Sequence, residues 1–202
     1  MASFVNTTIN SIVSGTGGDD TIRNSAGGAT IRAGAGNDYI YSSTSSSHMI
    51  NNGYGYVTID GGAGDDTIES FDPHVSINGG DGDDIIYPIG DYVGVTVRGG
   101  AGNDTLVNST VESDNGKLYQ YGDGDGNDVI ISFSESDTLA LLDNPTYSTM
   151  RSGNDVFVQI GLNMIDLDKA FGKNIHIIGG TRSQIDASPQ LKLGDSNYHI
   201  NR

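Results

Sequence analysis

Large apolar residues recur every nine residues along the first two thirds of the chain, and this spacing limits the fold more than any other feature. They form four runs, separated by insertions of ten, two and six residues: Phe4, Val13, Ile22, Ile31 and Ile40; Ile59, Ile68, Ile77 and Ile86; Val97 and Leu106; Tyr121 and Ile130. Such a unit is too short for a helical repeat but accommodates one short strand and one sharp turn. Two units close one coil, and stacked coils place parallel strands in two facing sheets. The spacing therefore predicts an all-β fold, a right-handed parallel β-roll.

The connections between these strands are of two kinds. One kind has a constant length and reads GTGGDD, AGAGND, GGAGDD, GGDGDD, GGAGND and DGDGND, at residues 15–20, 33–38, 61–66, 79–84, 99–104 and 123–128. The other kind varies in length and contains every insertion. Stacked coils would gather the six constant loops at one edge, here called the acidic edge, and the variable connections at the opposite, variable edge. Only the acidic edge has a constraint on length, which indicates that it carries a function.

The charge of the chain is concentrated in the same region. Of 26 acidic residues 23 are Asp, and residues 1–128 hold 18 acids and 4 bases, whereas residues 129–202 hold 8 and 6. Stacked loops would bring their carboxylates within about 5 Å of one another, which is unfavourable unless cations lie between them. Calcium suits such loops, because it binds oxygen ligands in flexible geometry and glycine can turn backbone carbonyls inward. The negative charge argues against nucleic acid and anionic membranes as partners.

The constant loops resemble the calcium-binding nonapeptide GGxGxDxUx of RTX (repeats-in-toxin) proteins, in which U is a large apolar residue. GGAGDDTI, GGDGDDII and GGAGNDTL match it fully, whereas AGAGNDYI, GTGGDDTI and DGDGNDVI depart from it at the first or second position. The resemblance covers residues 13–131 and, more loosely, 132–181. It implies a calcium-binding roll over 1–131 and a C-terminal β-rich cap over 132–181, followed by a tail over 182–202 that we expect to be flexible.

The resemblance also implies a set of calcium ligands. In RTX proteins an ion lies between two successive loops, bound by the second and fourth carbonyls and the Asp of one loop and by the first and third carbonyls and the Asp of the next. Carried over, five sites would comprise Thr16, Gly18 and Asp20 with Ala33, Ala35 and Asp38; Gly34, Gly36 and Asp38 with Gly61, Ala63 and Asp66; Gly62, Gly64 and Asp66 with Gly79, Asp81 and Asp84; Gly80, Gly82 and Asp84 with Gly99, Ala101 and Asp104; and Gly100, Gly102 and Asp104 with Asp123, Asp125 and Asp128. A sixth site would combine Gly124, Gly126 and Asp128 with Asp137.

The rest of the chain is expected to close the roll. Phe133, Leu139, Leu141 and Leu142 have the apolar content to cover the open end that stacked repeats leave. A further small core is predicted from Phe157, Ile160, Leu167 and Phe171, with a short helix over Asp166–Phe171.

The function that the resemblance implies is calcium binding by a secreted or cell-surface protein. Such a chain would leave the cell unfolded by type I secretion and fold on calcium outside, where sites with dissociation constants on the order of 10⁻⁴–10⁻³ M are filled. The chain has no cysteine, which fits an extracellular location. Its N-terminus has no signal-peptide pattern, so export would not use a cleaved leader, or the chain is an excised fragment. The C-terminus has no clear secretion signature.

Other functions remain open. Six tyrosines are predicted near the variable edge, where an adhesin would bind a glycan or a protein: Tyr39, Tyr41, Tyr54, Tyr56, Tyr87 and Tyr92. An enzyme is not expected, because no HExxH, GxSxG or P-loop pattern is present and the four histidines share no ligand spacing. We interpret the pair Asp72-Pro73 as a turn rather than a self-cleavage site. No apolar run is long enough to span a membrane, and we expect the isolated chain to be a monomer.

Overall fold

The computed structural model describes residues 1–44, 56–89, 94–108, 116–168, 170 and 175–182, and the backbone of 192–194 and 199–201. The strands form two sheets. The first contains, in spatial order, β1 (Ala2–Asn6), β3 (Asp20–Asn24), β5 (Tyr39–Ser42), β7 (Thr67–Ser70), β9 (Ile85–Pro88), β11 (Thr105–Val107), β13 (Asp128–Ile131), β17 (Asn163–Leu167), β16 (Asp155–Ile160), β15 (Thr146–Ser152) and β19 (Thr181–Arg182). The second contains β2 (Ile12–Ser14), β4 (Thr30–Ala35), β6 (Val57–Ala63), β8 (Val75–Asp81), β10 (Thr96–Ala101), β12 (Leu118–Tyr121), β14 (Thr138–Leu141), β18 (Ile175–Ile178), β21 (His199–Asn201) and β20 (Lys192–Gly194).

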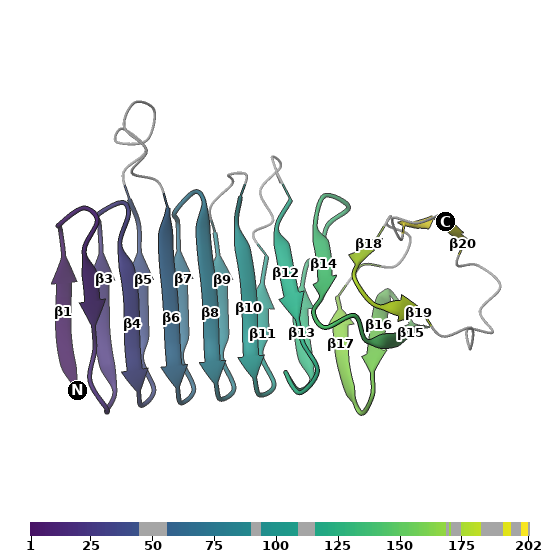
Figure 1. Ribbon diagram of the computed structural model, residues 1–202, viewed down its shortest axis with the longest axis horizontal. Coiled ribbons are helices and arrows are strands. Elements are labelled where there is room, and N and C mark those ends of the chain that lie inside the picture. The colour runs from purple at the N-terminus through teal and green to yellow at the C-terminus, as the bar shows by residue number, and fades with distance from the viewer. Residues whose placement is uncertain are drawn as a thin grey trace.

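From β1 to β14 consecutive strands alternate between the two sheets, so each coil contributes one strand to each. Within the roll every neighbouring pair is parallel, from β1 beside β3 and β2 beside β4 to β11 beside β13 and β12 beside β14. Figure 1 shows the coils stacked along the long axis, with uniform short loops at one edge and variable connections at the other. The predicted parallel β-roll is confirmed. No helix long and apolar enough to cross a membrane occurs among the residues that the structure describes.

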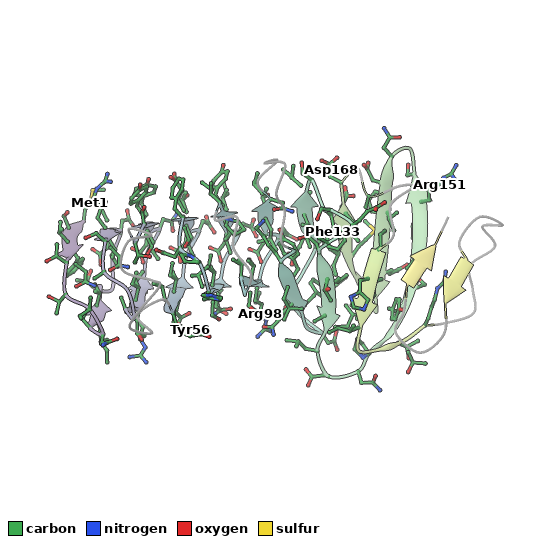
Figure 2. All side chains as sticks on the ribbon, turned by 90° about the horizontal axis from the view of Figure 1, so that it is seen from above. Met1, Tyr56, Arg98, Phe133, Arg151 and Asp168 are labelled. Atoms are coloured by element: carbon green, nitrogen blue, oxygen red, sulfur yellow. The ribbon has the colours of Figure 1, made fainter. Side chains whose placement is uncertain are left out.

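The core is a ladder of one large apolar side chain per strand. In the first sheet Ile22, Ile40, Ile68 and Ile86 lie in register, and in the second Ile31, Ile59 and Ile77 do; all of these are buried. Their neighbours in each strand point outward, because side chains alternate across a strand. Viewed from above, Phe133 lies between the sheets, with Arg98 on the outer side of one and Asp168 on the outer side of the other (Figure 2).

The ladder differs from the predicted spacing at one coil. The sequence spacing assigns Tyr121 to the ladder, but the register places Tyr119 opposite Val97 on one side and Leu139 on the other. Tyr121 follows two residues later, so it also points inward and is buried. The variable connection before β12 is therefore two residues shorter than the spacing implied. The acidic-edge loop after β12 is longer by the same amount.

The end of the roll is covered by strands, as expected. After β14 the chain forms β15, β16 and β17 as antiparallel neighbours, and β17 returns to pair in parallel with β13. Phe133, Leu139 and Leu141 are buried there, and Leu142 is half-buried. In the tail, the described backbone of β21 pairs with β18.

The further small core predicted beyond the roll is not separate. Ile160 and Leu167 are buried, but they belong to the same hydrophobic core as the ladder of the roll. Phe157 is half-buried and Phe171 lies outside the described residues. The predicted helix over Asp166–Phe171 is wrong at its start, because Asp166 and Leu167 belong to β17. The alternation of a strand, not the period of a helix, sets the burial of this segment.

At the variable edge, the Asp72-Pro73 pair lies in the bend between β7 and β8, as interpreted from the sequence. The Asp72 carboxylate is buried there. It accepts hydrogen bonds from the Thr44 N–H at 2.6 Å and from the Ser70 hydroxyl at 3.1 Å. This carboxylate therefore joins one variable connection to the one before it.

The ladder predicts that alanine substitutions at two isoleucines differ in their effect on stability. Ile77 is 1% exposed and lies in mid-ladder, whereas Ile12 is 67% exposed at the first coil. We expect Ile77→Ala to lower the free energy of unfolding by about 2–5 kcal/mol, because a core cavity remains. Ile12→Ala should cost less than about 0.5 kcal/mol. Urea denaturation in calcium measures both, and equal losses would contradict the ladder.

Candidate metal site along the acidic edge

The six constant loops stack at one edge of the roll, as the repeat predicts. Gly34, Gly62, Gly80 and Gly100 lie in register across four successive loops, and the residues after them do the same. Figure 1 shows these loops side by side along the lower edge. The structure therefore brings the second and third positions of successive loops into line.

Glycine at the second and fourth positions allows this close stacking. Gly80 and Gly82 have φ of +128° and +127°, a region that L side chains rarely adopt. A Cβ on either glycine would lie less than 3.0 Å from a carbonyl oxygen of the loop before, that of Gly62 or Gly64. The same two carbonyls are predicted ligands. Glycine therefore lets each loop approach the carbonyl row of its predecessor.

The sixth-position aspartates form a buried ladder of hydrogen bonds. Each backbone N–H donates to the Oδ1 atom of the next aspartate, over 2.7–3.0 Å, in the series Asp20, Asp38, Asp66, Asp84, Asp104 and Asp128. The ladder fixes every carboxylate in one orientation. The second oxygen, Oδ2, is buried without a hydrogen-bond partner at Asp38, Asp66, Asp84 and Asp104.

Burial makes the charged form of these carboxylates unfavourable. Burial raises the pKa of Asp84 to about 8, and the nearby Asp104 and Asp66 carboxylates raise it as well, although the Asp66 N–H hydrogen bond lowers it. Burial is also the main cause that raises the pKa of Asp66 and Asp104 to about 6 and of Asp128 to about 8. A buried, unpartnered carboxylate oxygen needs a cation or a proton. The row is therefore incomplete as a purely protein structure.

The predicted calcium ligands fit this need at the central loops. A Cβ on Gly79 would meet both the Asp84 Oδ2 atom and the Gly99 carbonyl oxygen, so these two predicted ligands face one small space. Gly61 has the same relation to Asp66 Oδ2 and the Gly79 carbonyl. Bound there, a calcium ion would supply the positive charge that the oxygens lack. Among the described residues no three acidic or histidine side chains gather for one metal. Backbone carbonyls make up most of each predicted ligand set.

The third-position carbonyls accept hydrogen bonds from the loop before. The carbonyls of Ala63, Asp81, Ala101 and Asp125 each accept the N–H of the fourth residue in the loop before, over 2.7–3.0 Å. A carbonyl oxygen has two lone pairs, so one remains for a cation. These hydrogen bonds hold successive loops at a fixed separation.

The first loop differs from the others. Thr16 donates to Asp20 Oδ2 through its N–H at 2.6 Å and its hydroxyl at 2.8 Å. Burial acts to raise the pKa of Asp20, but hydrogen bonds from Ala2 and Thr16 outweigh it and lower the pKa. Gly18 has no positive φ and no neighbour where a Cβ would be. The predicted first site thus has protein donors on one of its carboxylate oxygens.

The last loop and Asp137 also depart from the expected pattern. Asp125 forms an ion pair with Arg98, with an Nη2–Oδ1 distance of 2.7 Å. Asp137 is buried at the variable edge, where it accepts hydrogen bonds from Asn108 Nδ2 and the Lys117 N–H, each at 2.8 Å. Asp128 begins β13 at the acidic edge, so strand β13 separates it from Asp137. The proposed sixth site with Asp137 is therefore wrong.

A second ladder was not expected from the sequence. Fifth-position side chains accept the N–H of the fifth residue in the next loop, over 2.7–3.3 Å, along Asp19, Asn37, Asp65, Asp83, Asn103 and Asn127. Met164 donates to the last of them at 3.0 Å. Every loop has Asp or Asn at this position, and this regularity in the sequence could have indicated the second ladder. The position needs an acceptor oxygen rather than a charge.

The two ladders predict different effects for neighbouring aspartates. Asp84 faces two predicted sites, so Asp84→Asn should lower calcium affinity at both. If each loses about tenfold, the free energy of unfolding in saturating calcium falls by about 3 kcal/mol. Asp83→Asn keeps its acceptor oxygen and should cost less than about 0.5 kcal/mol. Urea denaturation at fixed calcium compares the two, and equal losses would refute the assignment of ligand and structural roles.

Comparison with known families agrees with this geometry. The chain matches the RTX calcium-binding nonapeptide repeat in four copies, at residues 14–44, 53–70, 75–88 and 96–107. The last copy ends before loop 123–128. No curated protein matches the chain. The matched copies contain five of the six stacked loops and their glycine and aspartate positions. The matched segments, between residues 14 and 107, are therefore RTX calcium-binding nonapeptide repeats.

Proposed function

We propose that the roll is a folding switch that calcium operates outside the cell. The observation that carries this proposal is the row of buried Oδ2 atoms at Asp38, Asp66, Asp84 and Asp104, which have no hydrogen-bond partner. Nonapeptide repeats of this family bind calcium, and the ions would lie between successive loops. Binding energy at these sites is then folding energy, because the ligands converge only in the stacked state.

The charge of the roll supports about five ions. Residues 1–128 carry 18 acids and 4 bases. Five calcium ions would bring +10 to a net charge of −14. Without them, stacking forces like charges together along the entire acidic edge. The metal-free chain would therefore be largely unfolded.

The proposed location is extracellular, after type I secretion. Weak sites are filled only where calcium is abundant, and extracellular modules bind it with dissociation constants on the order of 10⁻⁴–10⁻³ M. A chain that stays unfolded in low calcium suits export in an unfolded state. The chain also has no cysteine to be oxidised outside the cell.

A titration tests the switch. We expect the metal-stripped protein to show a coil spectrum in far-UV circular dichroism and to gain β-structure cooperatively as calcium is added. Magnesium should not replace calcium, because it requires a smaller octahedral site and dehydrates reluctantly. A β-rich spectrum that neither chelator nor calcium changes would refute the proposal.

A glycan-binding surface is the second candidate, and one cluster favours it. Tyr39 and Tyr41 lie on the outer face of the first sheet, where the Arg23 guanidinium is 5.9 and 5.7 Å from their ring centroids. Phe71 lies 5.6 Å from Tyr41, ring centroid to centroid. Tyr39 directly follows the acidic edge, so this cluster spans the sheet face and is not confined to the variable edge. Aromatic faces beside a polar cation are typical of sugar-binding surfaces.

Of the other tyrosines, Tyr56 is exposed beside His74 at the variable edge, and Tyr54 and Tyr92 lie outside the described residues. Glycan-array binding by the calcium-loaded protein that Tyr41→Ala abolishes and Ile12→Ala retains would support this function. Absence of binding in the folded protein would remove it.

A further inference from the structure

The acidic edge changes its geometry at the last loop. β12 pairs with β10 so that Tyr119 lies opposite Val97 and Gln120 opposite Arg98. Tyr121 comes next and therefore takes the place that Gly99 has in the coil before. The chain returns to the common register at Gly126, which bridges Gly102. Gly102 comes three residues after Gly99, but Gly126 comes five after Tyr121, so this loop contains two additional residues.

The first loop position matters because of the direction in which its side chain would point. At Gly79 a Cβ would lie less than 3.0 Å from both Asp84 Oδ2 and the Gly99 carbonyl oxygen. At Gly61 it would meet Asp66 Oδ2 and the Gly79 carbonyl in the same way. A side chain at Gly61 or Gly79 would therefore enter the space between the predicted ligands. Glycine leaves that space open toward the next loop.

Tyr121 has a phenol at this position. The side chain is 2% exposed, and its hydroxyl donates a hydrogen bond to the Gly126 carbonyl. Gly126 is the fourth residue of its loop, which is a predicted ligand position in the loops before. Burial, followed by the Asp128 carboxylate, raises the pKa of Tyr121, which agrees with a hydroxyl beside the last aspartate of the ladder.

Arg98 supplies a protein cation at the same loop. Its Nε and Nη2 atoms donate to the Asp125 carboxylate at 3.0 and 2.7 Å, and the Gly122 N–H donates to the same carboxylate at 2.7 Å. This bidentate pair attaches the longer loop to strand β10, which contains Arg98. Protein donors therefore satisfy the Asp125 carboxylate, as they satisfy one oxygen of Asp20 in the first loop.

We propose that Tyr121 terminates the calcium column. Its ring fills the volume that glycine leaves for an ion in the preceding loops, and its hydroxyl hydrogen satisfies the Gly126 carbonyl in place of a cation. The last ion would then lie between loops 99–104 and 123–128, and none beyond Asp128. This inference rests on the proposed calcium function of the roll and assigns the end of the column to one residue.

Two variants of Tyr121 and one matched control test the proposal. Tyr121→Gly reopens the space, so we expect it to bind one ion per chain more than wild type in equilibrium dialysis with saturating calcium. The same ion count as wild type would overturn the terminator role. Tyr121→Phe keeps the ring but removes the hydroxyl. It should bind the wild-type number of ions, with a folding equilibrium constant about three- to tenfold lower at fixed calcium.

Tyr87→Phe is the control, because it removes the same atom from a half-buried tyrosine on the outer face of β9, away from the last loop. Its folding constant should stay within about twofold of wild type. If Tyr121→Gly does not fold, the two phenylalanine variants decide, and equal constants would overturn the proposal. A wild-type protein that does not respond to calcium would instead refute the proposed function itself.

Discussion

The structure depends on one carboxylate oxygen that the protein does not satisfy. In each central loop the sixth-position aspartate uses Oδ1 to accept a backbone hydrogen bond and leaves Oδ2 buried without a partner, as at Asp66 and Asp84. A buried anion of this kind costs several kcal/mol unless it is paired. The stack repeats this cost at Asp38, Asp66, Asp84 and Asp104, so cations or protons on the acidic edge would stabilise the roll.

The apolar ladder and the acidic edge make opposite contributions to the stability of the stacked coils. Each buried isoleucine, such as Ile59 or Ile77, favours the stack by about 1.5–3 kcal/mol. The fixed register that buries these side chains also forces the aspartates into line, because both belong to the same short coil. In the proposed calcium-bound state, an ion between loops would turn the unfavourable term into a favourable one. Folding and binding would then be one process.

The regular part of this arrangement could be predicted from the sequence, because each coil repeats a local rule. The nine-residue spacing identified the ladder through Leu106. The constant loops identified the stacked acidic edge, since glycine at positions such as Gly80 and Gly82 has one steric reason. The ends could not be predicted in this way. Tyr119, not Tyr121, occupies the ladder position, because two of the inserted residues lie in the acidic-edge loop rather than in the variable connection. The alternation of side chains is the same in both cases and does not reveal the difference. The predicted site that combines Asp137 with Asp128 is wrong because β13 carries the chain to the opposite edge, where Asp137 lies.

A crystal structure of the calcium-loaded protein, with anomalous data to identify the ions, is the most direct test of the central claim. The account predicts anomalous peaks between successive loops, each about 2.3–2.6 Å from an Asp Oδ2 atom and from loop carbonyls, and none beyond Asp128. Peaks confined to exposed side chains, with Asp66 and Asp84 Oδ2 hydrogen-bonded only to water, would contradict it.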